Sequence, residues 1–545
     1  MTTAPYDETT PWWREAIIYQ VYPRSYLDTN GDGVGDLPGI TQKLDYIASL
    51  GVDIVWLSPF FKSPMKDFGY DISDYCEVDP LFGSLEDFDK LISKAHSLGL
   101  KIMIDQVMSH TAEAHPWFGE SRASRDNPKS DWYVWADPLA DGNPPNNWLS
   151  IFGGSAWQWD TRRRQYYLHN FLTSQPDLNF HNPEVQQAQL DALCFWLERG
   201  VDGVRMDACN YHFHDPQLRS NPPATRADNM MSTDVNPYGM QAHLYDKTRP
   251  ENLDFLKKIR TLLDEYGAIS IGEVGADDSL AVMADYTSGG NKLHMAYSFN
   301  LLTPDFSAAH IRAEVEEFEA RVRGGWVSWS VGNHDSVRVM TRWGREQPAP
   351  ALAKLVLAMQ LSLKGTPCLY QGDELALTEA EVPFEQLQDP FGIAFWPEFK
   401  GRDGCRTPMP WTAGQPHAGF TSGTPWLPVA APHVDAAVSN QEENTNSPLN
   451  FARRFIAWRP GQPQLTRGDI AFFDAPEPVL ALRRELDGAP AILAAFNLSD
   501  EPVAFAWPEA EGAGDVEGHG LPGSRTGAQI QLPPYGAWYG TVTGK

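Results

Sequence analysis

The sequence is poor in cysteine and has no long apolar run. Only five of its 545 residues are cysteines, and their spacing is not that of metal ligands. They are Cys76, Cys194, Cys209, Cys368 and Cys405. We therefore expect reduced thiols, as in a cytoplasmic protein, and neither a disulfide framework nor a zinc site. No stretch is apolar over the roughly 20 residues that a membrane-spanning helix needs, so no span is expected.

Positive charge is also scarce. The chain has 43 Lys and Arg against 71 Asp and Glu, a formal net charge of −28. Such a surface repels phosphate backbones and anionic lipids, so neither nucleic-acid nor membrane partners are expected. The first 17 residues have neither the basic region nor the apolar core of a signal peptide, which again favours the cytoplasm. Aromatic residues are abundant, with 19 Trp, and they suit stacking against neutral ligands such as sugars.

Eight short, nearly continuous apolar runs recur along the chain. They span residues 16–23, 53–60, 101–108, 203–209, 269–274, 295–300, 327–333 and 366–372. Continuous apolar character is typical of parallel strands that are buried on both faces. Amphipathic stretches lie between the runs, and Ser84 and Asn182 are predicted to cap two of these helices. The repeated strand–helix pattern predicts an α/β fold, a (β/α)8 TIM barrel.

Two segments interrupt this pattern. Residues 109–179, between the third and fourth strands, are rich in Trp, Asn, Pro and Gly and are too long for a simple loop. They are predicted to form an inserted domain. From about residue 468 short strands dominate, which predicts a C-terminal antiparallel β-sandwich over 468–545. The barrel is then made of residues 1–108 and 180–467.

Three acids fall at the ends of predicted strands, where barrel enzymes keep their chemistry. They are Asp207, Glu273 and Asp335. Asp207 and Glu273 would lie on adjacent strands ~4.8 Å apart, which allows the carboxyl separation of about 5–5.5 Å found in retaining glycosidases. Arg205, on the same strand face as Asp207, is predicted to keep it ionised, and the crowded Glu273 is predicted to hold a proton. A single acid at a strand end is usually a helix cap or a surface charge, whereas three acids at the strand ends of one barrel favour catalysis.

The segments that carry these residues resemble the α-amylase family (glycoside hydrolase family 13), in its oligo-1,6-glucosidase and α-glucosidase branch. The matching stretches are "GDLPGI", "DQVMSH" (105–110), "QPDLN" (175–179), "GVRMDACN" (203–210), "GEV" (272–274), "NHD" (333–335) and "GTPCLYQGDE". The resemblance covers nearly the whole chain. It implies a retaining enzyme with Asp207 as the nucleophile, Glu273 as the general acid/base and Asp335 as the transition-state stabiliser.

The same resemblance implies residues that bind the substrate, a small neutral oligosaccharide or α-glucoside. Those that would hold the glucose at the cleavage site are Arg205, His110 and His334. Asp71 and Arg402 would form a pair that closes the site behind the non-reducing end, which implies exo-acting release of single glucose units. Tyr70 is a candidate stacking platform, and a simply packed tyrosine is the alternative.

Ala208, the residue after the proposed nucleophile, bears on the linkage that is cleaved. In this branch valine at this position goes with α-1,6 activity and small residues go with α-1,4 activity. We therefore predict an α-glucosidase with maltose-type α-1,4 substrates, and transglucosylation where an alcohol replaces water. The alternatives are an oligo-1,6-glucosidase, or a sucrose- or maltose-acting isomerase or glucosyltransferase on the same scaffold. A further alternative is a non-catalytic relative, a barrel kept as a binding module. Such a protein should have lost one of the three acids, and this sequence has all three.

The stretch "DTNGDGVGD" (28–36) has the alternating oxygen ligands of a calcium loop. It is not an EF-hand, because Gly39 stands where the twelfth-position glutamate belongs and a strand precedes the loop. The residues predicted to hold one structural Ca²⁺ are Asp28, Asn30, Asp32 and Asp36 through side chains and Val34 through its carbonyl. Mg²⁺ is the alternative ion, and a turn without metal is the alternative structure. Ser109 stands where amylases use asparagine to recruit another calcium, so that ion is not implied. No organic cofactor is expected.

Overall fold

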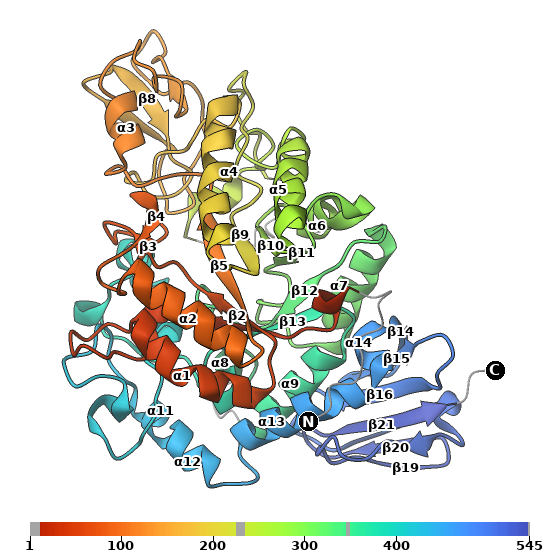
Figure 1. Ribbon diagram of the computed structural model, residues 1–545. Helices are drawn as coiled ribbons and strands as arrows, with labels where there is room; N and C mark the ends of the chain where they lie inside the picture. The colour runs from red at the N-terminus through yellow and green to blue at the C-terminus, as the bar shows by residue number, and fades with distance from the viewer. Residues whose placement is uncertain (1–10, 225–234, 345–348, 543–545) are drawn as a thin grey trace.

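The computed structural model of the protein describes residues 11–224, 235–344 and 349–542. The chain is built around eight parallel strands (Figure 1). These are β1 (Ile18–Val21), β2 (Ile54–Leu57), β5 (Lys101–Val107), β9 (Gly203–Asp207), β10 (Ile269–Val274), β11 (Met295–Ser298), β12 (Ser328–Ser330) and β13 (Thr366–Tyr370). Their order is β11-β10-β9-β5-β2-β1-β13-β12, and a parallel bridge between Ala296 and Val327 joins the two end strands. The predicted eight-stranded barrel is therefore confirmed.

Alternate residues of the barrel strands pack into two different cores. Ile18, Trp56 and Ile271 belong to a cluster inside the barrel. Their neighbours Tyr19 and Val55 belong to the larger cluster that the strands form with the helices. Because both faces are buried, the strands need apolar residues at nearly every position, which is the pattern seen in the sequence.

Helices cover the outside of the barrel (Figure 1). They are α1 (Leu37–Leu50), α2 (Leu85–Ser97), α4 (Pro183–Glu198), α5 (Asn252–Tyr266), α6 (Ser279–Thr287), α7 (Ala308–Arg321), α8 (Val339–Gly344) and α9 (Pro350–Ser362). Ser84 and Asp87 form a capping box at the start of α2, and the Asn182 side chain accepts a hydrogen bond from the Glu184 N–H at the start of α4. Both predicted caps are confirmed.

A small antiparallel sheet lies between β5 and β9 in the sequence and projects from the barrel, in orange in Figure 1. It consists of β6 (Trp135–Ala136), β7 (Trp157–Asp160) and β8 (Gln165–Leu168), and α3 (Pro116–Ser121) precedes it. A short hairpin, β3 (Phe61–Lys62) and β4 (Asp74–Val78), follows β2. The insertion leaves the barrel at the C-terminal end of β5 and returns to it before α4.

Short helices and two antiparallel sheets complete the chain (Figure 1). The helices are α10 (Pro390–Phe395), α11 (Ala431–Asp435), α12 (Val438–Glu442), α13 (Pro448–Trp458) and α14 (Pro463–Arg467). One sheet contains β14 (Asp469–Phe473), β15 (Val479–Glu485), β16 (Ala491–Asn497), β21 (Ala537–Val542) and β18 (Gly514–Asp515). The other contains β17 (Val503–Ala506), β20 (Gln529–Leu532) and β19 (Ser524–Thr526). Side chains from both sheets share one core, so the predicted β-sandwich is confirmed.

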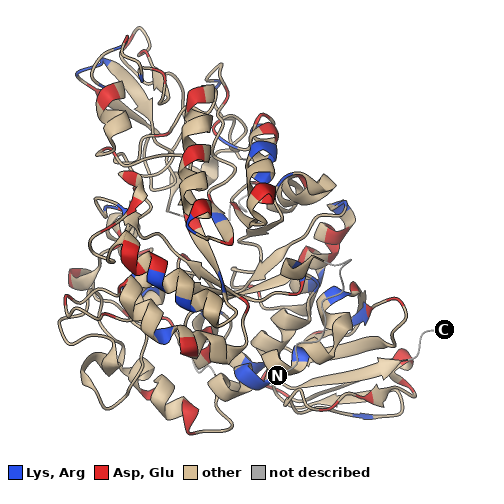
Figure 2. Cartoon of the chain, in the orientation of Figure 1, with Lys and Arg blue, Asp and Glu red and all other residues tan. Residues whose placement is uncertain are grey.

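Acidic and basic side chains are interspersed on the outer helices, as on α2 and α5 (Figure 2). All five cysteines are free thiols. In the parts of the chain that the structure describes, no helix is both long and apolar enough to cross a membrane.

Candidate active site

Arg205 on β9 is the centre of a buried charge cluster at the C-terminal end of the barrel strands. Its Nη1 donates to Asp105 Oδ1 at 2.8 Å and to Asp207 Oδ1 at 2.6 Å, and its Nη2 lies 2.7 Å from Glu273 Oε1. The strand register brings these residues together, since Arg205 pairs with Asp105 of β5 and with Ile271 of β10. Arg205 is fully buried, and Asp207 and Glu273 are 8% and 7% exposed.

Both oxygens of Glu273 are held by donors from neighbouring strands. The Tyr297 hydroxyl donates to Oε1 at 3.0 Å, and the Ala208 backbone N–H donates to Oε2 at 3.0 Å. Ala208 has a φ of 42°, in the left-handed region that residues with a Cβ seldom adopt. The strained turn at the end of β9 therefore directs a backbone donor at Glu273, as is common at functional sites.

Burial dominates the ionisation of this cluster. It raises the pKa of Asp207 well above its usual range; Arg205 opposes the rise and the Glu273 carboxylate adds to it. Burial likewise raises the pKa of Asp105 to about 6. Arg205 therefore lowers the Asp207 pKa, in the predicted direction, but burial and the neighbouring carboxylates raise this pKa, because three buried carboxylates share one guanidinium. A cluster with this excess of negative charge retains a proton, which acid catalysis requires.

Asp335 lies in a second cluster, with two arginines. Its Oδ1 accepts from Arg402 Nη1 at 3.1 Å and from Arg406 Nη2 at 2.7 Å, and its Oδ2 lies 3.2 Å from His334 Nε2. Burial raises the pKa of Asp335, but His334, Arg402 and Arg406 outweigh burial and hold this pKa well below its usual range. Asp335 therefore stays ionised.

The sequence predicted that Arg402 pairs with Asp71, but the structure does not show this pair. Its Nη2 instead donates to Asp67 Oδ1 at 3.0 Å and to Asp389 Oδ1 at 2.8 Å. The Asp71 carboxylate accepts from the Ser63 hydroxyl and from two backbone N–H groups of its own loop. Because those contacts occupy Asp71, Asp67 takes its place as the acidic partner of Arg402.

The predicted histidines are buried and neutral. Burial lowers the pKa of His110 to about 4 and that of His334 to about 3. His110 Nε2 lies 3.0 Å from the Tyr70 carbonyl oxygen, and the Tyr70 hydroxyl donates to Asp105 Oδ2 at 3.1 Å. The Tyr70 ring stacks on His334 with centroids 5.4 Å apart. One face of Tyr70 is therefore already covered, which favours the packed alternative over a sugar platform.

Sequence reasoning missed several members of these clusters. They are Asp67, Asp105, Tyr297, Asp389 and Arg406. Asp105 stands inside the stretch "DQVMSH", Arg406 lies four residues after the predicted Arg402, and Tyr297 lies within the predicted strand 295–300, so a signal existed for these three. Asp389 lies in a segment without periodicity, and nothing in the sequence pointed to it.

The loop of residues 28–36 is a series of turns closed by side chains. Asp28, Asn30 and Asp32 each accept a hydrogen bond from a backbone N–H further along the loop. Asp36 caps α1 by accepting from the Gly39 N–H at 2.7 Å. In the described ranges, no three Asp, Glu, His or Cys side chains are arranged to hold a metal. These contacts hold the loop in compact turns, and one structural Ca²⁺ bound by Asp28, Asn30, Asp32, Val34 and Asp36 stays a prediction.

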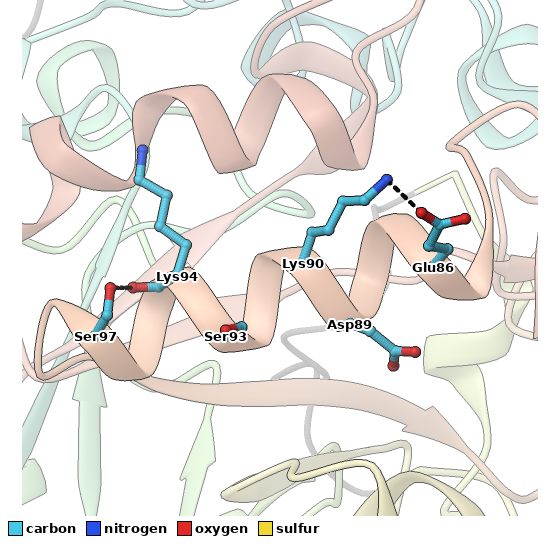
Figure 3. Close-up of a pocket in the computed structure, with 6 residues that line it drawn as sticks. All are labelled: Glu86, Asp89, Lys90, Ser93, Lys94 and Ser97. Carbon is cyan, nitrogen blue, oxygen red and sulfur yellow. Dashed lines mark hydrogen bonds and ion pairs between the residues drawn. The ribbon is translucent and has the colours of Figure 1, made fainter.

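The hollow drawn in Figure 3 is separate from both charge clusters. The residues that line it are Glu86, Asp89, Lys90, Ser93, Lys94 and Ser97. All belong to α2, and Lys90 pairs with Glu86 one turn away at 2.9 Å. This hollow is therefore the open groove beside a solvated helix face, and we assign no chemistry to it.

Known proteins resemble the chain over its whole length. Residues 20–468 match the family described as "Alpha amylase, catalytic domain". The chain is 53% identical to a probable alpha-glucosidase of Rhizobium meliloti (strain 1021), over 99% of this chain and 98% of that protein. It is 36% identical to an oligo-1,6-glucosidase of Heyndrickxia coagulans, over 92% and 94%. The crystal structure of the alpha-glucosyl transfer enzyme XgtA matches with a TM-score of 0.96 at 59% identity, covering 98% and 100% of the two chains.

Proposed function

Because the chain belongs to the α-amylase family of glycoside hydrolases, we propose that it is a retaining, exo-acting α-glucosidase for terminal, non-reducing α-1,4-linked glucosides. The observation that carries the proposal is the Arg205 guanidinium, which binds Asp207 on β9 and Glu273 on β10. Carboxylates on adjacent strands that share one guanidinium fit the separation of about 5–5.5 Å in retaining enzymes better than the about 6.5–9.5 Å of inverting ones. The α-glucosidase and oligo-1,6-glucosidase relatives support the substrate class.

The proposed reaction has two displacements. Asp207 attacks the anomeric carbon while Glu273 gives its proton to the departing glycosidic oxygen, and a β-glucosyl-enzyme forms. Water then attacks the same carbon, gives its proton to Glu273 and releases the Asp207 carboxylate. Asp335, which the two arginines keep ionised, is proposed to bind the sugar hydroxyl groups as positive charge develops on the ring.

The contacts of Arg402 support exo action. Its guanidinium joins Asp67, in the segment after β2, to Asp389 and Asp335. This bridge ties three loops together beside the carboxylate cluster, and we propose that it meets the non-reducing end of the sugar. His110 and His334, neutral and buried, are proposed to bind hydroxyl groups of the same glucose unit.

Ala208 and the relatives bear on linkage and on the second step. A small side chain at this position favours α-1,4 over α-1,6 cleavage. The likeness to the alpha-glucosyl transfer enzyme XgtA supports transglucosylation, in which an alcohol takes the place of water. The likeness to an oligo-1,6-glucosidase keeps α-1,6 cleavage as the second candidate.

A substrate panel tests the proposed function. Maltose, isomaltose, sucrose, trehalose and an aryl α-glucoside are each incubated with the enzyme, and the linkages of the products are identified. We expect free glucose and a higher kcat/KM for maltose than for isomaltose. Faster cleavage of isomaltose would favour the oligo-1,6-glucosidase, and isomerised sucrose would favour a synthase. Glucose from none of them would overturn the proposal.

We also propose that loop 28–36 binds one Ca²⁺ through the side-chain oxygens of Asp28, Asn30, Asp32 and Asp36 and the Val34 carbonyl. Removing an ion present at 100 times its Kd should cost about 2.7 kcal/mol of stability. A chelator is therefore expected to lower Tm by several degrees, and added Ca²⁺ to restore it. In the Asp32→Ala variant the chelator should have no effect. A wild-type Tm that is indifferent to the chelator would contradict the site.

The five free thiols support a reducing compartment, and we propose that the enzyme acts in the cytoplasm on small neutral saccharides. Cell fractionation followed by immunodetection tests this location. Recovery in the secreted fraction would contradict it.

A further inference from the structure

Tyr297 on β11 reaches both parts of the catalytic cluster. It lies beside Glu273 in the register of β10 and β11 and is 1% exposed. Its hydroxyl oxygen is 2.8 Å from Arg205 Nη2 and 3.3 Å from Arg205 Nε, and it is 3.0 Å from Glu273 Oε1. One hydroxyl group therefore bridges the guanidinium and the carboxyl group of the proposed acid.

The chemistry of the two partners fixes the direction of these hydrogen bonds. An arginine has only donors, so the Tyr297 oxygen accepts from Arg205. The single hydroxyl proton is then directed to Glu273 Oε1. Burial raises the pKa of Tyr297 well above its usual range, so this proton stays on the phenol.

The two oxygens of Glu273 are consequently not equivalent. Oε1 accepts from both Arg205 Nη2 and the Tyr297 hydroxyl. Among the residues that the structure describes, Oε2 has one donor, the Ala208 N–H at 3.0 Å, which holds this oxygen at the end of β9 beside Asp207. A proton cannot be placed on Oε1 without displacing one of these two donors.

We propose that Tyr297 is a positioning residue that, together with Arg205, saturates Glu273 Oε1 and so confines the transferable proton to Oε2. The inference rests on the proposed glycosidase reaction. In the first step the glycosidic C–O bond breaks, a bond forms between the anomeric carbon and Asp207, and the Oε2 proton goes to the leaving oxygen. In the second step the proton of the attacking water returns to Oε2.

The test is Tyr297→Phe, which keeps the ring and removes only the hydroxyl group. General acid–base catalysis contributes about 10²–10⁴-fold to the rate. We expect kcat/KM for maltose, whose leaving oxygen needs a proton, to be about 10- to 100-fold lower in the variant than in the wild type. For α-glucosyl fluoride, whose leaving group does not need full protonation, kcat/KM should change by less than about threefold. Active sites are titrated with 5-fluoro-α-glucosyl fluoride, so that misfolded protein is not counted.

The second step gives an independent readout. With the fluoride as substrate, the variant is expected to turn over slowly, because water is activated poorly. Azide attacks without giving up a proton, so adding sodium azide should restore the rate and yield α-glucosyl azide. Tyr297→His, which retains a ring with an N–H donor, should recover part of the activity on maltose.

Tyr19→Phe is the matched control, since the buried Tyr19 hydroxyl donates to Glu374 Oε1 at 2.8 Å within the same barrel. In this control the ratio of kcat/KM for maltose to kcat/KM for the fluoride should equal that of the wild type. The inference is overturned if Tyr297→Phe lowers kcat/KM equally for both substrates or lowers it for neither. If the wild-type enzyme itself hydrolyses neither substrate, the proposed function fails, which is a different outcome.

Discussion

Replacing Asp207 with Asn is expected to lower kcat for maltose and for aryl α-glucosides by at least about 10⁴-fold. The amide cannot attack the anomeric carbon, but its oxygen can still accept the Arg205 hydrogen bond that Asp207 accepts at 2.6 Å. Burial raises the pKa of Asp207, so the ionised carboxylate is costly in the native state. The neutral amide removes this cost, and we expect a Tm equal to or above that of the wild type.

Asp177→Asn is the matched control for this experiment. Asp177 is a buried aspartate that accepts from the Asn170 backbone and lies outside both charge clusters. Burial raises its pKa to about 8, so an amide imitates the neutral acid present at pH 7. Its kcat should stay close to that of the wild type. Equal losses in the two variants, or substantial turnover by Asp207→Asn, would show that Asp207 is not the nucleophile.

Replacing Asp67 with Asn is expected to lower kcat/KM for maltose by about 100-fold, mostly through KM, because Arg402 and the Asp335 that it holds shift from their positions. Arg402 Nη2 donates to Asp67 at 3.0 Å, and Asp67 also accepts from Gln175 at 3.0 Å. Asn keeps the shape of the side chain but loses the charge that faces the guanidinium.

The comparison that decides this prediction is with Asp71→Asn. In the described parts of the chain, the Asp71 carboxylate accepts only from Ser63 and from backbone groups of its own loop. Asp71→Asn should therefore cost about 1–2 kcal/mol of stability and little activity. Kinetics and Tm of the two variants are measured side by side. A larger loss of kcat/KM in Asp71→Asn than in Asp67→Asn would restore Asp71 as the functional partner of Arg402.

The barrel could be predicted because its strands obey a simple physical rule. Strands that are buried on both faces need apolar residues at nearly every position, and the runs that became β1, β2 and β5 show this directly. The caps at Ser84 and Asn182 are equally local, since side chain and backbone donor lie within three residues. Arg205, Asp207 and Glu273 could be placed together because parallel strands bring their carboxyl ends to one edge.

The remaining contacts are not local. Asp67 and Asp71 lie four residues apart in one loop, and side-chain direction in a loop has no period from which to choose between them. Asp389 and Arg406 reach the site from a segment without strand periodicity. The pKa of Asp207 was predicted from one neighbour, Arg205, which lowers it, whereas burial among three carboxylates raises it.

The central claim is that Asp207 and Glu273 perform a double displacement. The most direct measurement is proton NMR of the glucose first released from maltose or an aryl α-glucoside, recorded before the anomers equilibrate. The account predicts α-glucose first, with the β anomer appearing only as mutarotation proceeds. β-Glucose as the first product would contradict it.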